Sequence, residues 1–213
     1  MTATTSLIVA PLGTSDVAAG VSLFARAFDN DAMARLLCPD PAERRRFQER
    51  GGRSQIEKAM PYRHVFGAYE NQALRGLAVW LPPGVAVPSF GAPPLRSVPR
   101  LAATIARTPR DVIRLVHNRQ RAHTAAHATP GWYLAFLATD PYHQRRGIGR
   151  HLLNHILTRA DADGTPVWLE TSDPVNVPIY ERFGFGVTAR VDAGPRLPTF
   201  WVMVRSPGGA SSG

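Results

Sequence analysis

The sequence predicts one α/β domain, and two observations lead to this prediction. Two apolar runs of strand length, Trp132–Thr139 and Val167–Thr171, flank a segment over 147–162 whose apolar residues recur at helical spacing. The chain has 213 residues, which is long enough for one well-buried core and short for two. We therefore expect a single domain over residues 1–205 and a flexible C-terminal tail over 206–213, which has nothing to bury.

The first part of the chain is expected to open with a strand, continue through helices and return as a hairpin. Over 14–28, residues typical of a helix start are followed by apolar residues at helical spacing. Gly51-Gly52 interrupts the charged segment after them. Two runs of β-forming residues separated by three polar residues are typical of a hairpin. The expected elements are a strand over 7–9, a helix over 14–28, helices over 41–50 and 55–60, and strands over 63–69 and 73–81.

Proline and glycine dominate residues 82–98, which we expect to be a loop because neither flank could form a core alone. Two helices are expected next, over 100–107 and 109–126. Several arginines share one face of the second helix. Such a face is most often simply solvated, so the sequence does not favour nucleic-acid binding.

The helix over 147–162 is justified by a buried stripe and by Gly164 just past its end. The expected stripe consists of Leu152, Leu153, Ile156 and Leu157. A short helix over 178–183 and two closing strands, over 187–191 and 199–204, complete the mixed α/β chain.

Composition limits the class of protein and its compartment. The formal net charge of +9 would attract a polyanion, whether nucleic acid, an anionic membrane or a phosphorylated cofactor, and charge alone does not choose among these. A single cysteine, Cys38, cannot form an internal disulfide. No segment approaches a membrane-spanning length, and residues 1–13 lack the basic start of a secretory signal. We expect a cytoplasmic protein with no membrane partner.

A glycine-containing loop lies directly between the strand Trp132–Thr139 and the helix that follows. It reads Gln144-Arg145-Arg146-Gly147-Ile148-Gly149-Arg150. Glycines remove side chains where an anion must approach the backbone, and free N–H groups in the first turn of a helix bind phosphate oxygens. The arginines add positive charge at the same place. A merely solvated turn is the alternative, and the loop alone does not decide between the two.

A second motif follows the strand Val167–Thr171 and reads Asn176-Val177-Pro178-Ile179-Tyr180-Glu181-Arg182-Phe183-Gly184-Phe185. Together the two segments resemble the GNAT acetyltransferase superfamily, whose cofactor loop reads Gln/Arg-x-x-Gly-x-Gly/Ala and whose later segment reads Asn…Tyr…x-Gly-Phe. The matching residues are Gln144, Gly147 and Gly149, then Asn176, Tyr180, Gly184 and Phe185. Residues 169–174, the run after Ile179, and 187–189 look especially like the puromycin N-acetyltransferase branch.

The resemblance implies a GNAT fold, in which helices flank a mixed, mostly antiparallel sheet whose splayed central strands hold acetyl-coenzyme A. The splayed strands would be Trp132–Thr139 and Val167–Thr171. Backbone N–H groups of Leu137 and Thr139 would then hydrogen-bond the thioester carbonyl and the pantetheine amides. The implied cofactor contacts are Leu137, Ala138, Thr139, Gln144, Arg145, Arg146, Gly147, Ile148, Gly149, Arg150, Asn176 and Tyr180.

The resemblance also implies an acid for the reaction, and the residues suggest a base. Tyr180 would donate a proton to the departing coenzyme A thiolate, although a tyrosine packed as an ordinary helix residue is the alternative. The attacking amine must be neutral, so a base is needed. Glu170 is the first candidate, and it could instead bind a cationic acceptor or an arginine. Asp140 and Glu70 are weaker options.

The predicted function is acetyl transfer from acetyl-coenzyme A to an amine of a small molecule, an antibiotic-like or metabolite amine, with Trp80 and Tyr133 near the acceptor. The alternatives are a protein amine acetyltransferase and a non-catalytic acyl-coenzyme A sensor. His151 and His155 lack the acidic partner of a His-Glu-x-x-His metal site, so no metal is expected. A homodimer stays open as an oligomeric state.

Overall fold

A computed structural model describes residues 7–85, 130–192, 194 and 197–209, together with five single positions between 102 and 113. The strand Ala73–Leu81 ends at a turn over 82–85, where the expected loop begins. The rest of that loop and the helices predicted over 100–107 and 109–126 lie outside the described residues, apart from those five positions.

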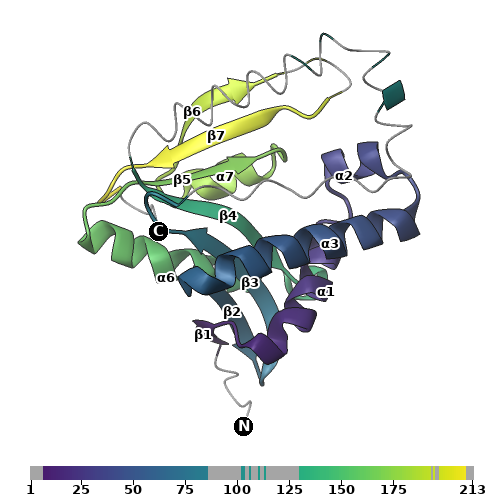
Figure 1. The fold of residues 1–213 in the computed structure, drawn as a ribbon. Helices are drawn as coiled ribbons and strands as arrows, with labels where there is room; N and C mark the ends of the chain where they lie inside the picture. The colour runs from purple at the N-terminus through teal and green to yellow at the C-terminus, as the bar shows by residue number, and fades with distance from the viewer. Residues whose placement is uncertain are drawn as a thin grey trace.

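A seven-stranded sheet forms the centre of the described part of the chain, with the strand order β1-β2-β3-β4-β5-β7-β6 (Figure 1). Every neighbouring pair is antiparallel except β4 and β5, so the expected mixed, mostly antiparallel sheet is confirmed. The strands are β1 (Leu7–Pro11), β2 (Val65–Glu70), β3 (Ala73–Leu81), β4 (Trp132–Thr139), β5 (Val167–Thr171), β6 (Gly186–Val191) and β7 (Phe200–Arg205).

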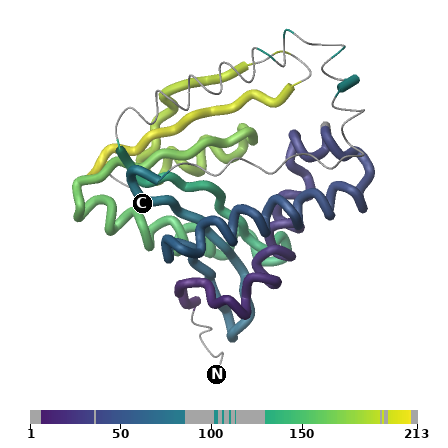
Figure 2. Tube along the Cα trace, viewed as in Figure 1, coloured from purple at the N-terminus to yellow at the C-terminus, as the bar shows by residue number. Residues whose placement is uncertain are grey.

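Helices cover both faces of the sheet, as Figures 1 and 2 show. One apolar cluster joins α1 and α3 to β3 and β4, and a second joins α6 and α7 to the opposite face. The buried stripe expected on α6 is confirmed, since its four residues are at most 4% exposed. The helices are α1 (Val17–Ala27), α2 (Ala32–Leu37), α3 (Pro41–Ala59), α6 (Ile148–Ala162) and α7 (Asn176–Glu181).

Sequence patterns placed most elements correctly. The hairpin between β2 and β3 turns through Asn71 and Gln72, whose φ angles of 51° and 63° suit the two-residue turn that strand twist favours. The predicted helix over 178–183 is displaced, because α7 begins two residues earlier. Helix α2 was not predicted; it is short, and Asp31 caps it by accepting a hydrogen bond from Ala34 N (2.8 Å).

The prediction of two helices separated at Gly51-Gly52 is wrong, because α3 runs unbroken through both glycines. A Cβ added to Gly52 would lie 2.7 Å from Cδ1 of Phe24 on α1. Gly52 therefore lets two helices approach closely and does not end either of them. Nothing lies within 4 Å of a Cβ added to Gly51.

This difference predicts opposite effects of the same substitution at adjacent positions. Gly52→Ala should destabilise the fold by about 1–3 kcal/mol, because the new methyl group overpacks the contact with Phe24. Gly51→Ala should stabilise it by about 0.5–1 kcal/mol, because alanine loses less backbone entropy than glycine in a helix. Denaturant unfolding of both variants measures the two changes. Equal shifts of the same sign would mean that Gly52 has no packing role.

Among the described residues, no helix is both long and apolar enough to cross a membrane. The segment over 206–213, for which a loose tail was expected, is described as far as Gly209. There, Gly208 N donates to Asp161 Oδ1 (2.8 Å) and Gly209 O accepts from Arg205 Nη2 (2.7 Å).

Candidate active site

The two parallel strands at the centre of the sheet part after three residue pairs. Trp132, Tyr133 and Leu134 of β4 pair with β5, and Leu134↔Leu169 is the last of these pairs. Strand β4 continues to Thr139 beside β3, whereas the rest of β5 pairs only with β7 among the described strands. The central strands are therefore splayed, as the GNAT resemblance implies.

A bulge in β4 accompanies this parting of the strands. In the pairing with β3, Trp80↔Leu134 is followed by Val79↔Phe136, so Ala135 is the extra residue. A bulge reverses which face the following side chains occupy. Leu137 therefore packs with the apolar cluster of α6, whereas Phe136 packs with that of α1 and α3.

The register also fixes where the backbone N–H groups of β4 point. Asp140 N donates to Arg75 O (2.9 Å), so this is a hydrogen-bonded antiparallel pair. Hydrogen-bonded and non-hydrogen-bonded pairs alternate along an antiparallel ladder. Ala138 therefore bonds toward β3, and the backbone groups of Leu137 and Thr139 point away from β3, into the opening left by β5.

At the end of β4 the chain turns into α6 through the glycine loop. Arg145 has φ of 62° and Gly147 has φ of 80°, and Gly147 is the N-cap residue of the helix. The first intrahelical bond runs from His151 N to Gly147 O (3.1 Å), so the N–H groups of Ile148 to Arg150 precede it. The three loop arginines are exposed, and they surround a helix end that attracts anions.

Gly149 has no packing reason to be glycine. A Cβ added there would lie 3.6 Å from Leu137 Cδ2 and 3.8 Å from Thr139 Oγ1, which is ordinary van der Waals contact. Its φ is not in the left-handed region. Glycine inside a helix costs about 0.5–1 kcal/mol relative to alanine. Among the described residues, packing therefore gives no reason for this glycine.

Gly76 on β3 lets α6 lie close to the sheet. A Cβ added to Gly76 would come within 2.4 Å of Ile148 Cγ2 and 2.9 Å of Leu152 Cδ1. The N-terminal turn of α6 is thus seated directly over β3, beside the end of β4. This contact places the first turn of α6 beside the part of β4 that no longer pairs with β5.

Tyr180 lies on α7 and is 9% exposed. It belongs to the same apolar cluster as Leu134 and Leu169, the last paired residues of β4 and β5. Burial raises the pKa of Tyr180 to about 12, so the phenol keeps its proton at neutral pH. A protonated phenol at this place is able to act as a general acid.

The start of α7 is tied to the end of β5. Asn176 Nδ2 donates to Thr171 Oγ1 (3.3 Å), and Asp173 Oδ1 accepts from Val175 N (3.0 Å). These bonds fix the direction in which α7 leaves the strand and so help to place Tyr180. The Asn176 side chain thus has a structural partner in addition to its expected contact with the cofactor.

The three candidate bases lie in different surroundings. Glu170 is half-buried and follows the last β4–β5 pair, and alternation along β5 directs it to the face that Trp168 shares with α1 and α3. Glu70 lies beside Arg75, 3.8 Å from its Nε, at the hairpin. Asp140 accepts hydrogen bonds from Arg26 Nη2 (2.9 Å) and Tyr142 N (3.0 Å).

Asp140 ties the loop after β4 to helix α1. Burial raises the pKa of its carboxyl group, but the hydrogen bonds from Tyr142 and Arg26, together with the charges of Arg26 and His143, outweigh burial and hold the pKa below its usual value. This carboxylate stays ionised and engaged, which suits an anchor better than a proton acceptor.

The two aromatic residues expected near the acceptor lie on opposite faces of the sheet. Trp80 is fully buried in the cluster of α6. Tyr133 is 6% exposed and stacks on Trp168 at 4.0 Å between ring centroids, in the cluster of α1 and α3. The pair therefore does not form one wall of a pocket, and Trp80 lies in the core.

Three phenylalanine rings and two polar side chains gather on the face of Glu170. The rings of Phe24, Phe28 and Phe136 pack within 4.5 to 6.3 Å of one another between centroids. Ser172 Oγ, just after β5, donates to Asp31 Oδ2 (3.4 Å) at the start of α2. Asp31 and Ser172 are 141 positions apart, so no local pattern could have joined them.

His151 and His155 are exposed on α6, and the His155 ring packs on Phe66 with 4.3 Å between centroids. His151 Nδ1 donates to Gly147 O (2.9 Å), since a carbonyl oxygen only accepts. The described part of the chain contains no group of three metal-binding side chains. Cys38 is fully buried.

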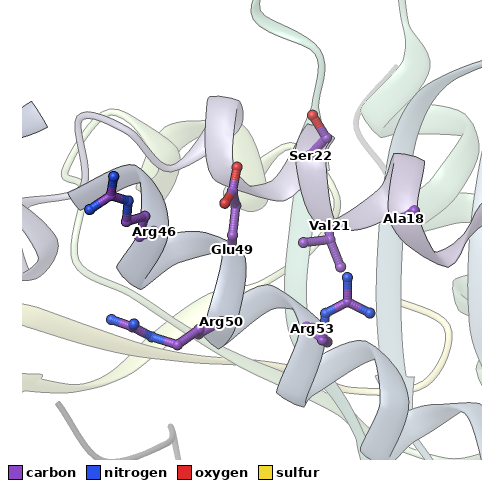
Figure 3. Close-up of a pocket in the computed structure, with 7 residues that line it drawn as sticks. All are labelled: Ala18, Val21, Ser22, Arg46, Glu49, Arg50 and Arg53. Carbon is purple, nitrogen blue, oxygen red and sulfur yellow. The ribbon is translucent and has the colours of Figure 1, made fainter. Parts of the chain in front are cut away.

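A hollow of about 430 Å³ lies between α1 and α3. Its arginines sit on α3, and their guanidinium groups do not converge on one point (Figure 3). None of its lining residues comes from β4, β5 or α6, so it is separate from the opening described above. The lining consists of Ala18, Val21, Ser22, Arg46, Glu49, Arg50 and Arg53.

Comparison with known proteins assigns the family. The profile described as "Acetyltransferase (GNAT) family" matches residues 30–185, which is more than half of the chain. The chain therefore belongs to the GNAT acetyltransferase family, a class of acetyl-coenzyme A-dependent N-acetyltransferases.

Two relatives match only part of their own length. An uncharacterized N-acetyltransferase of Schizosaccharomyces pombe, C550.08, is 41% identical over 54 residues, which are 25% of this chain and 22% of that protein. The [ribosomal protein bS18]-alanine N-acetyltransferase of Salmonella typhimurium is 40% identical over 52 residues, 23% of this chain and 35% of that protein.

Solved structures share the fold over nearly the whole chain. The Corynebacterium glutamicum structure described as "histone acetyltransferase HPA2 and related acetyltransferase" has a TM-score of 0.62 at 22% identity, covering 97% of this chain and 99% of that one. The polyamine N-acetyltransferase of Drosophila melanogaster has a TM-score of 0.61 at 14% identity, covering 94% and 100%. The PaiA N-acetyltransferase of Thermoplasma acidophilum, solved with coenzyme A, has a TM-score of 0.56 at 12% identity, covering 94% and 99%.

Proposed function

We propose that this protein transfers the acetyl group of acetyl-coenzyme A directly to an amine of a small molecule. One observation carries the proposal: β4 and β5 part beside the N-terminal turn of α6, and the protonated phenol of Tyr180 belongs to the apolar cluster that contains the last residue pair of these strands. The residues fit the cofactor, because Gly149 leaves the first turn of α6 bare without a packing reason.

In this proposal the loop over 144–150 and the first turn of α6 hold the pyrophosphate. The N–H groups of Leu137 and Thr139, which point into the opening, bind the pantetheine amides and the thioester oxygen before charge develops there. The amine nitrogen attacks the thioester carbon and loses a proton to a base, and the C–S bond breaks. Tyr180 gives its phenolic proton to the leaving sulfur.

The acceptor is proposed to be a cationic amine with an apolar or aromatic body. The face of Glu170 is apolar, because the buried rings of Phe24 and Phe136 pack there with the half-buried ring of Phe28. Asp31, which accepts a hydrogen bond from Ser172 just after β5, provides a carboxylate. Trp168 and Tyr133 add a stacked aromatic pair to the same cluster. Puromycin is a reasonable first acceptor because of the resemblance over 169–189 to the puromycin branch.

A protein amine is the second candidate acceptor. The observation that favours it is the relative from Salmonella typhimurium, which acetylates the ribosomal protein bS18 at an alanine and is 40% identical over 52 residues. A sensor that binds acetyl-coenzyme A without turnover is the alternative outside the enzymes. A single domain over residues 1–205, a cytoplasmic location and a homodimer are further proposals, which limited proteolysis, fractionation and light scattering would test.

The decisive experiment is a thiol-release assay with acetyl-coenzyme A and three groups of acceptors: aromatic and aliphatic amines, aminonucleosides including puromycin, and peptides with a free amine. A Cys38→Ala control and a blank without acceptor remove any signal from the protein thiol. Turnover of small amines supports the proposal. Turnover of peptides alone would favour the second candidate, and binding without acceptor-dependent thiol release would identify a sensor.

Glu170→Gln should lower kcat/KM about 10²-fold at neutral pH. An amine with a pKa near 10 is mostly protonated at this pH, and the variant lacks the carboxylate that would remove the proton. The deficit should shrink as pH rises, because free neutral amine becomes more abundant. Glu181→Gln, which removes an exposed carboxylate beside Tyr180, is the matched control and should leave the pH profile unchanged. A constant deficit at every pH would assign Glu170 to acceptor binding instead of proton removal.

A further inference from the structure

Arg205, the last residue of β7, is buried and uses nearly all of its hydrogen-bonding capacity. Its side chain is 4% exposed. The guanidinium forms a two-pronged pair with Asp161, Nη1 to Oδ1 at 2.5 Å and Nη2 to Oδ2 at 2.8 Å. Its remaining bonds run to backbone carbonyls, from Nε to Phe183 O (2.7 Å) and from Nη2 to Gly209 O (2.7 Å). A planar fork with this geometry holds its partners in fixed directions.

These four bonds join three segments that are far apart in the sequence. Asp161 lies in the last turn of α6, the helix whose first turn is the anion-binding end. Phe183 lies in the turn that follows α7. Gly209 O also lies 3.0 Å from the position of a Cβ on Gly184, whose φ is 83°, so this turn packs against the segment after β7.

The turn after α7, which Arg205 holds through Phe183 O, is hydrogen-bonded directly to Tyr180. Phe183 N and Phe185 N both donate to Tyr180 O, at 2.9 and 3.3 Å. The Phe185 ring meets the Tyr180 ring edge-on, with 5.8 Å between centroids. Any shift of Phe183 O therefore moves the backbone and the ring that hold Tyr180. Among the described residues, no side chain hydrogen-bonds to the Tyr180 hydroxyl, so these contacts set its position.

We propose that Arg205, oriented by Asp161, is a positioning residue that sets the phenol of Tyr180 against the leaving sulfur. The inference rests on the proposed acid role of Tyr180. A reacting group displaced by about 1 Å loses up to about 10²-fold in rate. Lysine keeps the charge of Arg205 but lacks the fork that reaches Asp161, Phe183 O and Gly209 O together.

A double-mutant cycle tests the proposal. Arg205→Lys should lower kcat about tenfold. The affinity for acetyl-coenzyme A should change little, because the substitution leaves the loop over 144–150 and the first turn of α6 intact. In the Tyr180→Phe background the same substitution should change kcat less than about twofold, since residues that act as one unit are not additive. Asp161→Asn, which keeps the side-chain shape, gives a second variant if Arg205→Lys does not fold. Asp163→Asn, which breaks only the exposed Arg159 pair two residues away, is the matched control.

Each outcome decides a separate point. An equal loss of kcat with and without the Tyr180 hydroxyl would show that Arg205 acts elsewhere, and would overturn the proposal while the acid role of Tyr180 stands. If both Arg205→Lys and Asp161→Asn lower the melting temperature and leave kcat unchanged, the hydrogen bonds of Arg205 have a purely structural role and the proposal is overturned. No effect of Tyr180→Phe itself would overturn the acid role and this inference together.

Discussion

We expect Tyr180→Phe to lower kcat by about 10²-fold and to leave the dissociation constant of acetyl-coenzyme A nearly unchanged. The hydroxyl is needed when charge develops on sulfur, so its loss affects the transition state and not the binding of the cofactor. A thiol such as that of cysteine has a reference pKa near 8.5, so a thiolate leaves partly unaided, which keeps the expected loss at the low end of general-acid effects. Steady-state kinetics and calorimetry measure the two quantities.

The loss of kcat in Tyr180→Phe should depend on pH. Burial raises the pKa of Tyr180 to about 12, so the acid form is present throughout the neutral range and is lost only as pH rises toward that value. The deficit of Tyr180→Phe should therefore persist from neutral pH up to the pH at which Tyr180 begins to ionise. It should shrink at low pH, because solvent supplies protons more readily there.

A second phenol provides the control. The Tyr69 hydroxyl donates to Asp16 Oδ2 (2.8 Å), and burial together with this bond raises its pKa above the usual value. Tyr69→Phe should lower stability by about 1 kcal/mol and leave kcat unchanged. Full kcat in Tyr180→Phe, with chemistry shown to be rate-limiting, would remove Tyr180 from the mechanism.

We expect Gly149→Val to weaken acetyl-coenzyme A binding about 100-fold, because two charge-assisted hydrogen bonds worth about 1.5 kcal/mol each would be lost. The branched side chain would stand over the first turn of α6, where the pyrophosphate must approach. The fold should survive, because a Cβ at this position meets only Leu137 and Thr139, at 3.6 and 3.8 Å. Gly149→Ala should give an intermediate loss of affinity, together with unchanged or higher stability.

The control for Gly149→Val is Asn154→Val, which places a β-branched residue at an exposed position of the same helix. It should affect helix stability alone. Gly147 is a less clean test, because its φ of 80° strains any other residue and couples binding to folding. Unchanged affinity in a folded Gly149→Val protein, measured by calorimetry, would overturn the proposal that the pyrophosphate binds at the first turn of α6.

Local patterns were sufficient for the parts of the site that are continuous in sequence. The order of β4, the glycine loop, α6 and β5 was predicted from apolar runs and helical spacing, and each lies within one residue of its expected bounds. The motif around Tyr180 was likewise read from adjacent residues. These features depend on backbone propensity and on spacing, which neighbouring residues in the chain determine.

The sequence by itself determined the class of fold and pointed to the glycine loop and Tyr180 as candidate site residues. Tertiary structure alone decided that α3 passes through Gly52, because only packing against Phe24 gives that glycine its purpose. It also placed Trp80 and Tyr133 on opposite faces and paired Arg205 with Asp161 across 44 positions. The bulge at Ala135, which turns Leu137 toward α6, is likewise set by pairing with β3. Each of these features depends on which distant segment packs opposite a residue, and the neighbouring residues in the sequence do not determine that segment.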